Sequence, residues 1–147
     1  MSTTAAPIDI ADLAARLRLG VTRLARKLRQ QAEPGITPSM LSALTSLRHH
    51  GRVTMRELGT HEQVQPPTMT RVVAGLVEAG LATRTADPRD GRVAWVEITP
   101  AGSRLLDRYH RRREAYLTKA LGKLEPREVL ILDDAVSILE RLTEAAP

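Results

Sequence analysis

The spacing of hydrophobic residues predicts long helices at both ends of the chain. In the first segment, apolar residues recur at three- and four-residue steps, at Ile10, Leu13, Leu17, Val21, Leu24 and Leu28. This spacing is typical of an amphipathic helix, and basic side chains accompany it on the other face. We expect the proline and glycine at 34–35 to end this helix. Similar spacing predicts a second long helix that starts at Thr99-Pro100 and a last one that starts at Glu125-Pro126.

Three shorter helices are predicted in the middle of the chain. Thr37 precedes a proline, which is a typical helix start, and Gly51 is a stop signal. Thr54 and Glu57 have the spacing of a capping box, in which each side chain satisfies a free amide of the other residue. A third helix is expected at 66–80, where two prolines occupy the first turn and a glycine closes the last.

A β-hairpin is predicted immediately after these helices. The runs 81–86 and 93–98 are rich in strand-forming residues, and the turn between them reads Asp87-Pro88-Arg89-Asp90-Gly91-Arg92. Because this turn has no large apolar side chain to bury, it is expected to project into solvent or onto a partner. Arginine on a narrow ribbon suits the negative potential of the DNA minor groove, but an ordinary solvated turn has the same composition.

Composition narrows the class of protein. The chain has 147 residues, of which 42% are hydrophobic and 2% aromatic, and phenylalanine is absent, so a mainly helical single domain is expected. The net charge of +5 is compatible with nucleic-acid binding. Without cysteine, neither disulfides nor thiolate metal sites form within the chain. No apolar run suggests a membrane span, and Asp9 and Asp12 argue against a signal peptide, so we expect a cytoplasmic protein.

The order of short helix, turn, second helix and hairpin is that of a winged helix-turn-helix. If the motif opens at Met55, its core positions are apolar, at Leu58, Val64, Met69 and Val72. Gly59 then lies where the two helices cross closely. Glu62 occupies a position that is usually apolar, and Gln63 one that is usually a turn glycine, which leads us to expect an unusual turn geometry.

The chain resembles the multiple antibiotic resistance regulator (MarR) family of bacterial transcription factors over nearly its whole length. The resemblance rests on four segments, namely residues 67–73 (PTMTRVV), 76–81 (LVEAGL), 87–92 (DPRDGR) and 98–102 (ITPAG). It implies a single domain, 1–147, that is mainly α-helical with a small β-hairpin. Within it, residues 36–99 would form the winged helix-turn-helix lobe, and 8–35 with 100–146 a helical dimerisation region. It further implies a homodimeric repressor on a palindromic operator of double-stranded DNA, released in many members by a small-molecule effector.

Carried onto this sequence, the resemblance places DNA-binding residues on three parts of the lobe. Two helix starts would face the DNA backbone, the recognition helix would enter the major groove, and Arg89 would read the minor groove while Arg92 contacts phosphate or pairs with a wing aspartate. The expected set is Thr37, Ser39, Thr54, Gln65, Pro67, Thr68, Thr70, Arg71, Arg89 and Arg92. For the threonines and the serine, helix capping or solvation is the competing interpretation.

Other candidate sites carry weaker signals. An effector pocket between the lobes would be lined by Arg16, Arg23, Met40, Tyr109 and Tyr116, although dimer packing or surface exposure also accounts for them. No residues have the spacing of metal ligands around the adjacent histidines at 49–50, and no cofactor is expected. The charge run at 110–113 is typical of a solvated helix face.

Two alternatives to a sequence-specific regulator stay open from the sequence alone. The first is a winged helix used for protein contact, or a DNA-binding dimer of low specificity without ligand control. The second is an enzyme, which the sequence argues against. It contains no nucleophile-base-acid set and no phosphate-binding glycine loop.

Overall fold

The computed structural model describes residues 6–144, so the ends of the predicted domain 1–147 and the last two residues of 100–146 lie outside it. The elements are α1 (Ile10–Arg29), α2 (Pro38–His50), β1 (Val53–Thr54), α3 (Met55–Glu62), α4 (Pro66–Glu78), β2 (Ala82–Ala86), β3 (Ala94–Ile98), α5 (Pro100–Leu121) and α6 (Pro126–Glu144). The fold is mainly helical with a small antiparallel sheet, as predicted. None of the helices in this part of the chain is long and apolar enough to cross a membrane.

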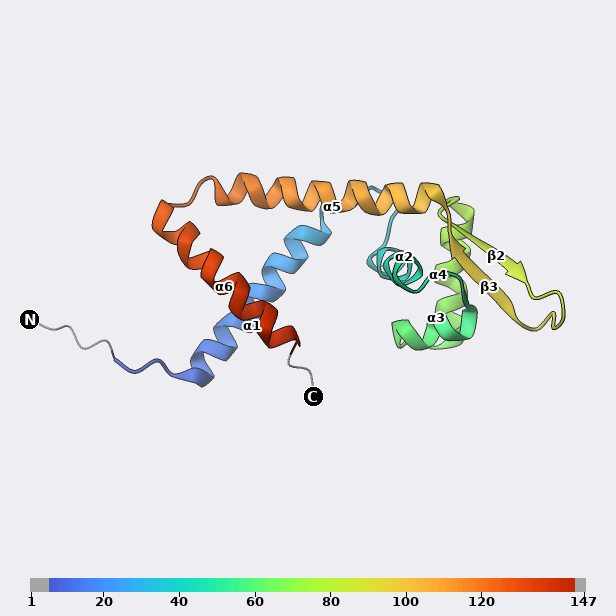
Figure 1. The fold of residues 1–147 in the computed structure, drawn as a ribbon, viewed down its shortest axis with the longest axis horizontal. Helices are drawn as coiled ribbons and strands as arrows, with labels where there is room; N and C mark the ends of the chain where they lie inside the picture. Colours follow the sequence, from blue (N-terminus) through green and yellow to red (C-terminus); the bar gives the residue numbers. More distant parts are fainter. Residues whose placement is uncertain (1–5, 145–147) are drawn as a thin grey trace, which may run out of the picture.

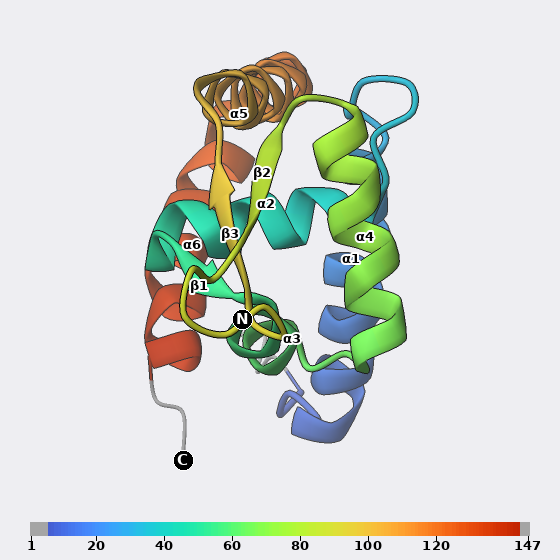
Figure 2. The same ribbon diagram turned by 90° about the vertical axis from the view of Figure 1, so that its right-hand side faces the viewer.

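Helix α5 connects two lobes of different construction (Figure 1). Its first turns lie over α2, α4 and the sheet, whereas its last turns lead into α6. Helices α1 and α6 cross in Figure 1 but lie on opposite sides in Figure 2, so they do not lie side by side. The first lobe contains α2 to β3, and the second contains α1, α6 and the distal half of α5.

Helix boundaries follow the capping residues read from the sequence, with one exception. Thr37, Thr54 and Thr99 each accept a hydrogen bond from a backbone amide of the helix that follows, and Gly51 ends α2 with φ 76°. Helix α1, however, ends at Arg29 rather than at the expected proline-glycine pair. The amide of Gln30 still bonds to the carbonyl oxygen of Arg26, four residues back. The amides of Gln31 and Ala32 bond three residues back, to Leu28 and Arg29, and these tighter turns satisfy carbonyls at the end of the helix.

The sheet has three strands in the order β1-β3-β2, one more than the predicted hairpin. In the register, Trp95 on β3 lies opposite Thr85 of β2 and Thr54 of β1. Strand β1 was missed because two residues are too few to show an alternating pattern. It ties the start of α3 to β3 at Trp95 and Val96.

The hydrophobic core lies in the first lobe, between α2, α3, α4, the sheet and the start of α5. Its most deeply buried side chains are Leu44, Leu47, Leu58, Met69, Val73, Leu76, Val96 and Leu106. At the junction with α5, a Cβ on Gly102 would overlap the carbonyl oxygen of Leu81, so only glycine fits there. Arg48 and Asp107 form a further link, an ion pair of 2.8 Å between α2 and α5.

Helices α1 and α6 have no buried residue. Their apolar stripes are exposed along their length; Val21 on α1 is 49% exposed and Val136 on α6 is 51% exposed. Such a surface is uncommon for a monomer in water, because contiguous apolar patches usually mark a contact with another molecule.

Candidate nucleic-acid interface

The turn between α3 and α4 keeps ordinary helix-turn-helix geometry despite its unusual sequence. Gln63 adopts the left-handed conformation, φ 55° and ψ 41°, which a glycine would adopt there. The expectation of an unusual turn geometry is therefore wrong. Among the described residues other than glycine, Gln63 alone has a positive φ, so the surrounding contacts must hold it there.

Gly59 and Glu62, which lie close to this turn, were both singled out from the sequence. A Cβ on Gly59 would lie 3.5 Å from the carbonyl oxygen of Val64, an ordinary contact, so an alanine would also fit. That Cβ would also lie 3.9 Å from Cβ of Met69 on α4, so the two helices pass close to each other here and leave room for a small residue only. Glu62 does not face a hydrophobic core, because its carboxylate accepts hydrogen bonds from the hydroxyls of Ser42 and Ser46 on α2.

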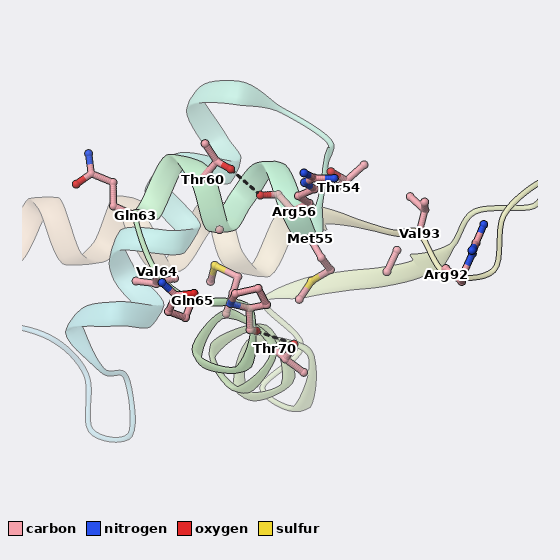
Figure 3. Close-up of a pocket in the computed structure, with 14 residues that line it drawn as sticks. Thr54, Met55, Arg56, Thr60, Gln63, Val64, Gln65, Thr70, Arg92 and Val93 are labelled. Atoms are coloured by element: carbon pink, nitrogen blue, oxygen red, sulfur yellow. Dashed lines mark hydrogen bonds between the residues drawn. The ribbon is translucent and has the colours of Figure 1, made fainter.

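The start of α4 lies between two concave surfaces. The larger one encloses about 930 Å³ between α3, the first turns of α4 and the part of the wing where the tip turn enters β3 (Figure 3). Among the predicted DNA-binding residues, it brings together Thr54, Gln65, Thr70 and Arg92. The smaller surface lies on the other side of α4 and brings together Ser39 and Thr68.

The turn at the tip of the wing, residues 87–92, is held by Asp87. The indole Nε1 of Trp95 donates to one carboxylate oxygen at 2.8 Å, and the amides of Arg89 and Asp90 donate to the other at 2.8 and 3.0 Å. These bonds, the one from Trp95 foremost, lower the pKa of Asp87 below its ordinary value. Arg52 lies over the Trp95 ring, 4.6 Å from its centroid, which further supports the base of the wing.

The two wing arginines differ in their surroundings. Arg92 is bound to Asp90, with Nε 3.1 Å from Oδ1, so the predicted pairing with a wing aspartate is present. Arg89 uses its backbone amide in the turn, while its side chain is exposed at the tip. Arg89 is therefore placed as the side chain that reaches outward, and Arg92 as one that also braces the turn.

The remaining predicted contacts lie at helix starts or on α4. Thr37 and Thr54 cap α2 and α3, so the competing interpretation of these residues as N-caps holds whether or not they also meet phosphate. The Thr70 hydroxyl donates to the carbonyl oxygen of Pro66 at 2.9 Å and keeps an acceptor lone pair. Pro67 and Arg71 are exposed on the first turns of α4, outside both concave surfaces.

The structure does not gather the five predicted effector-pocket residues. Met40 and Tyr109 belong to the core of the first lobe, whereas Arg16 pairs with Asp12 on the exposed surface of α1. Arg23 is exposed on the same helix, and Tyr116 is half-buried on α5. Neither of the two concave surfaces contains any of them, so the effector pocket stays a prediction.

Sequence reasoning missed several residues that face the larger surface or stand near the turn. Arg56 and Thr60 line the larger surface from α3, in line with the DNA-facing role of a first motif helix. His61 stacks on His50, with ring centroids 3.8 Å apart and planes 7° apart. Parallel stacking does not converge the ring nitrogens, and within residues 6–144 no group of side chains is arranged to hold a metal ion.

Comparisons with known proteins agree with this geometry. The MarR family model matches residues 36–94, the lobe that carries the motif and the wing. An HTH-type transcriptional regulator of Mycobacterium bovis is 37% identical over 93% of this chain and 96% of its own. The HTH-type transcriptional repressor MdtR of Bacillus subtilis is 29% identical over 81% of this chain and 75% of its own.

The fold comparison extends over both lobes. A solved structure from Pseudomonas aeruginosa, assigned to the transcriptional regulators, is 32% identical, covers 95% of this chain and 100% of its own, and superposes with a TM-score of 0.81. The match to its full length includes α1, α5 and α6 as well as the winged lobe. The chain belongs to the MarR family of DNA-binding, helix-turn-helix transcriptional regulators.

Proposed function

We propose that this regulator is a homodimeric repressor of a palindromic operator. Each subunit places α4 in a major groove and residues 87–92 in the flanking minor groove. The observation that carries the proposal is the exposure of the apolar faces of α1 and α6, because a second copy of the chain would cover both.

The dimer follows from the distribution of apolar surface. The exposed stripe on α1 contains Ile10, Leu13, Leu17, Val21 and Leu24, and the stripe on α6 contains Val129, Leu132, Val136, Leu139 and Leu142. Each stripe has the helical spacing that packs against another helix. A twofold axis beside α1 and α6 would cover both stripes with the same stripes of a second chain.

The DNA geometry follows from the first lobe. The start of α4 and the wing border one concave surface, which fits the sugar-phosphate backbone that separates a major from a minor groove. Thr54, Arg56 and Arg92 would meet phosphates there, whereas Gln65, Thr68, Thr70 and Arg71 would reach base edges or phosphates of the major groove. Arg89 would enter the minor groove, and twofold symmetry gives half-sites about 10 base pairs apart.

Repression is supported by the relative MdtR, which is itself a repressor. Release by a small ligand is part of the proposal through the family resemblance, with Arg16, Arg23, Met40, Tyr109 and Tyr116 as its candidate residues. Such a regulator acts where the chromosome lies, so a cytoplasmic location belongs to the same proposal.

The test is selection of binding sites from a random duplex pool at physiological salt, combined with sedimentation equilibrium of the purified protein. We expect a dimer and an enriched palindrome with half-sites one helical turn apart. Retained DNA without an enriched sequence would favour the low-specificity alternative, since binding through phosphate contacts does not prefer one sequence over another. A monomer at micromolar concentration would overturn the dimer.

A further inference from the structure

A row of polar contacts joins α2 to the end of α3. On α2, Ser42, Ser46 and His50 follow one another at four-residue steps, so they share one face of the helix. On α3, His61 and Glu62 meet that face: both serines donate to Glu62, Ser42 at 2.5 Å, and His50 stacks on His61. These five residues are called here the polar seam.

A carboxylate at position 62 destabilises the folded protein unless other contacts compensate for it. Glu62 is the last residue of α3, where the helix dipole disfavours a negative charge. It is also partly buried, and a carboxylate removed from water needs hydrogen bonds to offset desolvation. The two serine hydroxyls supply those bonds from an adjacent helix, 20 and 16 residues away in sequence.

The polar seam lies directly before the turn that aims α4. Gln63, which follows Glu62, is in the strained left-handed conformation. Its amide donates to the carbonyl oxygen of Thr60 at 3.2 Å, and the amide of Val64 donates to that of Gly59 at 3.1 Å. A shift of the end of α3 would therefore move the start of α4, where the side chains that read DNA are placed.

We propose that Glu62 is a positioning residue for the recognition helix α4, acting through its hydrogen bonds to Ser42 and Ser46. It contacts no DNA in this assignment. The carboxylate fixes the last turn of α3 against α2, which keeps Gln63 left-handed and α4 in register with the major groove. The inference rests on the DNA-reading role of α4 and deepens it.

The expected signature is a loss of selectivity without a loss of fold. When the hydrogen bonds to Glu62 are removed, only a fraction of the molecules hold α4 in register with the major groove. The operator affinity then falls in proportion to that fraction. Binding to unrelated DNA depends on phosphate contacts, which tolerate a displaced helix. The ratio of the operator affinity to the affinity for unrelated DNA should therefore fall. A general loss of stability would not lower this ratio at temperatures where the variant stays folded.

The experiment compares full-length variants with the wild type on the selected operator and on an unrelated duplex, over a range of salt. Glu62→Ala and the double variant Ser42→Ala/Ser46→Ala should each lose operator affinity by about tenfold while affinity for the unrelated duplex changes by less than about twofold. Combining all three changes should cost no more than either alone, because they remove the same contact. Glu62→Gln, which keeps an acceptor and adds a donor, should bind the operator within about threefold of the wild type.

Two control variants match the changes in chemistry without touching the polar seam. Thr45→Ala removes a hydroxyl of α2 that bonds within its own helix, and Glu114→Ala removes an exposed carboxylate from α5. Both should bind like the wild type. Thermal unfolding of every variant establishes that it is folded at the temperature of the binding measurement.

Hydrogen exchange of the amides of Gln63 and Val64 supplies a readout that needs no DNA. These amides should exchange faster in Glu62→Ala than in the wild type and the controls. Unchanged exchange, or a serine variant that binds the operator normally, overturns the proposal. If the wild type itself prefers no sequence, the operator proposal fails while the exchange measurement still decides whether Glu62 holds the turn.

Discussion

The winged lobe and the helical lobe of this protein solve the burial of apolar surface in opposite ways. The winged lobe closes a core around Leu44, Leu76 and Val96 with residues of its own chain. The helical lobe has two amphipathic helices, α1 and α6, with no buried residue between them. Equally regular patterns in the sequence thus lead to a unit with its own core in one case and to an uncovered apolar surface in the other, which we have proposed to be half of a dimer interface.

The largest effect is expected from a charge in the exposed stripe of α6. Leu132→Asp would bury an unpaired carboxylate in each subunit of the dimer, which should raise the dimer dissociation constant at least about a hundredfold. Sedimentation equilibrium measures it, and operator binding should fail with it. Ser137→Asp places the same charge on another face of α6 and should leave a dimer. A Leu132→Asp protein that remains dimeric would show that α6 is not in the interface.

A cavity in the core of the winged lobe should lower the unfolding free energy of the subunit rather than weaken the dimer. Leu44→Ala removes a fully buried side chain and should cost about 2–5 kcal/mol of unfolding free energy. Because this core lies within one subunit, we expect the loss in denaturant unfolding to be similar at low and high protein concentration. Leu130→Ala, at a residue 67% exposed on α6, should cost less than about 0.5 kcal/mol. A strongly concentration-dependent Leu44→Ala penalty would contradict the self-sufficiency of this lobe.

The wing belongs to the winged lobe but projects away from its core, so changes at its tip should separate binding from stability. Arg89→Ala should weaken operator binding by about tenfold, mainly at sites with a narrow flanking minor groove, with an unchanged melting temperature. Fluorescence anisotropy on duplexes with and without an A-tract flank measures the difference. Thr70→Ala should instead change the base preference within the half-site. Equal losses on every duplex would contradict both assignments.

The smallest effect is expected from pH. Burial, and then the positive charges of His61 and His49, lower the pKa of His50 below its ordinary value of 6.5. The folded state therefore binds fewer protons than the unfolded state, so the stability is fully present above pH 6.5 and falls as the pH drops below it. Urea unfolding between pH 8 and pH 5 should show this slope. His50→Gln should flatten it, and an unchanged slope in that variant would contradict the role of His50.

The sequence predicted elements well wherever a local signal sets a boundary. Helix starts were predicted at Thr37, Thr54 and Thr99 because an N-cap side chain bonds to amides only two or three residues away. The end of α1 at Arg29 was missed because the turn after it is made by backbone bonds that need no special residue. Strand β1 was missed because its pairing with β3 is a contact between distant segments.

In the candidate site, too, the features set by neighbouring residues were predicted and those set by distant contacts were not. The acidic and basic residues of the turn at 87–92 marked the wing, and its pairing of Arg92 with an aspartate depends on near neighbours. The bond from Trp95 to Asp87 and the polar seam depend on how separate strands and helices are placed, so the sequence did not predict these contacts. Only Glu62 stood out, because it occupies a position that is usually apolar. Gln63 shows the consequence: it departs from the usual glycine, yet it adopts the left-handed conformation that a glycine favours.

Helix α5 has a mechanical consequence as the connection between the lobes. It is anchored at its start, where Thr99 bonds to Gly80 and Gly102 packs on Leu81, and it runs 22 residues toward α6. A helix of that length is a rigid lever of about 33 Å, so a tilt of about 5° at one end displaces the other by about 3 Å. In the proposed dimer, a small rotation where the subunits meet would therefore be magnified at the DNA, and the separation of the two recognition helices would depend on how α1 and α6 are packed.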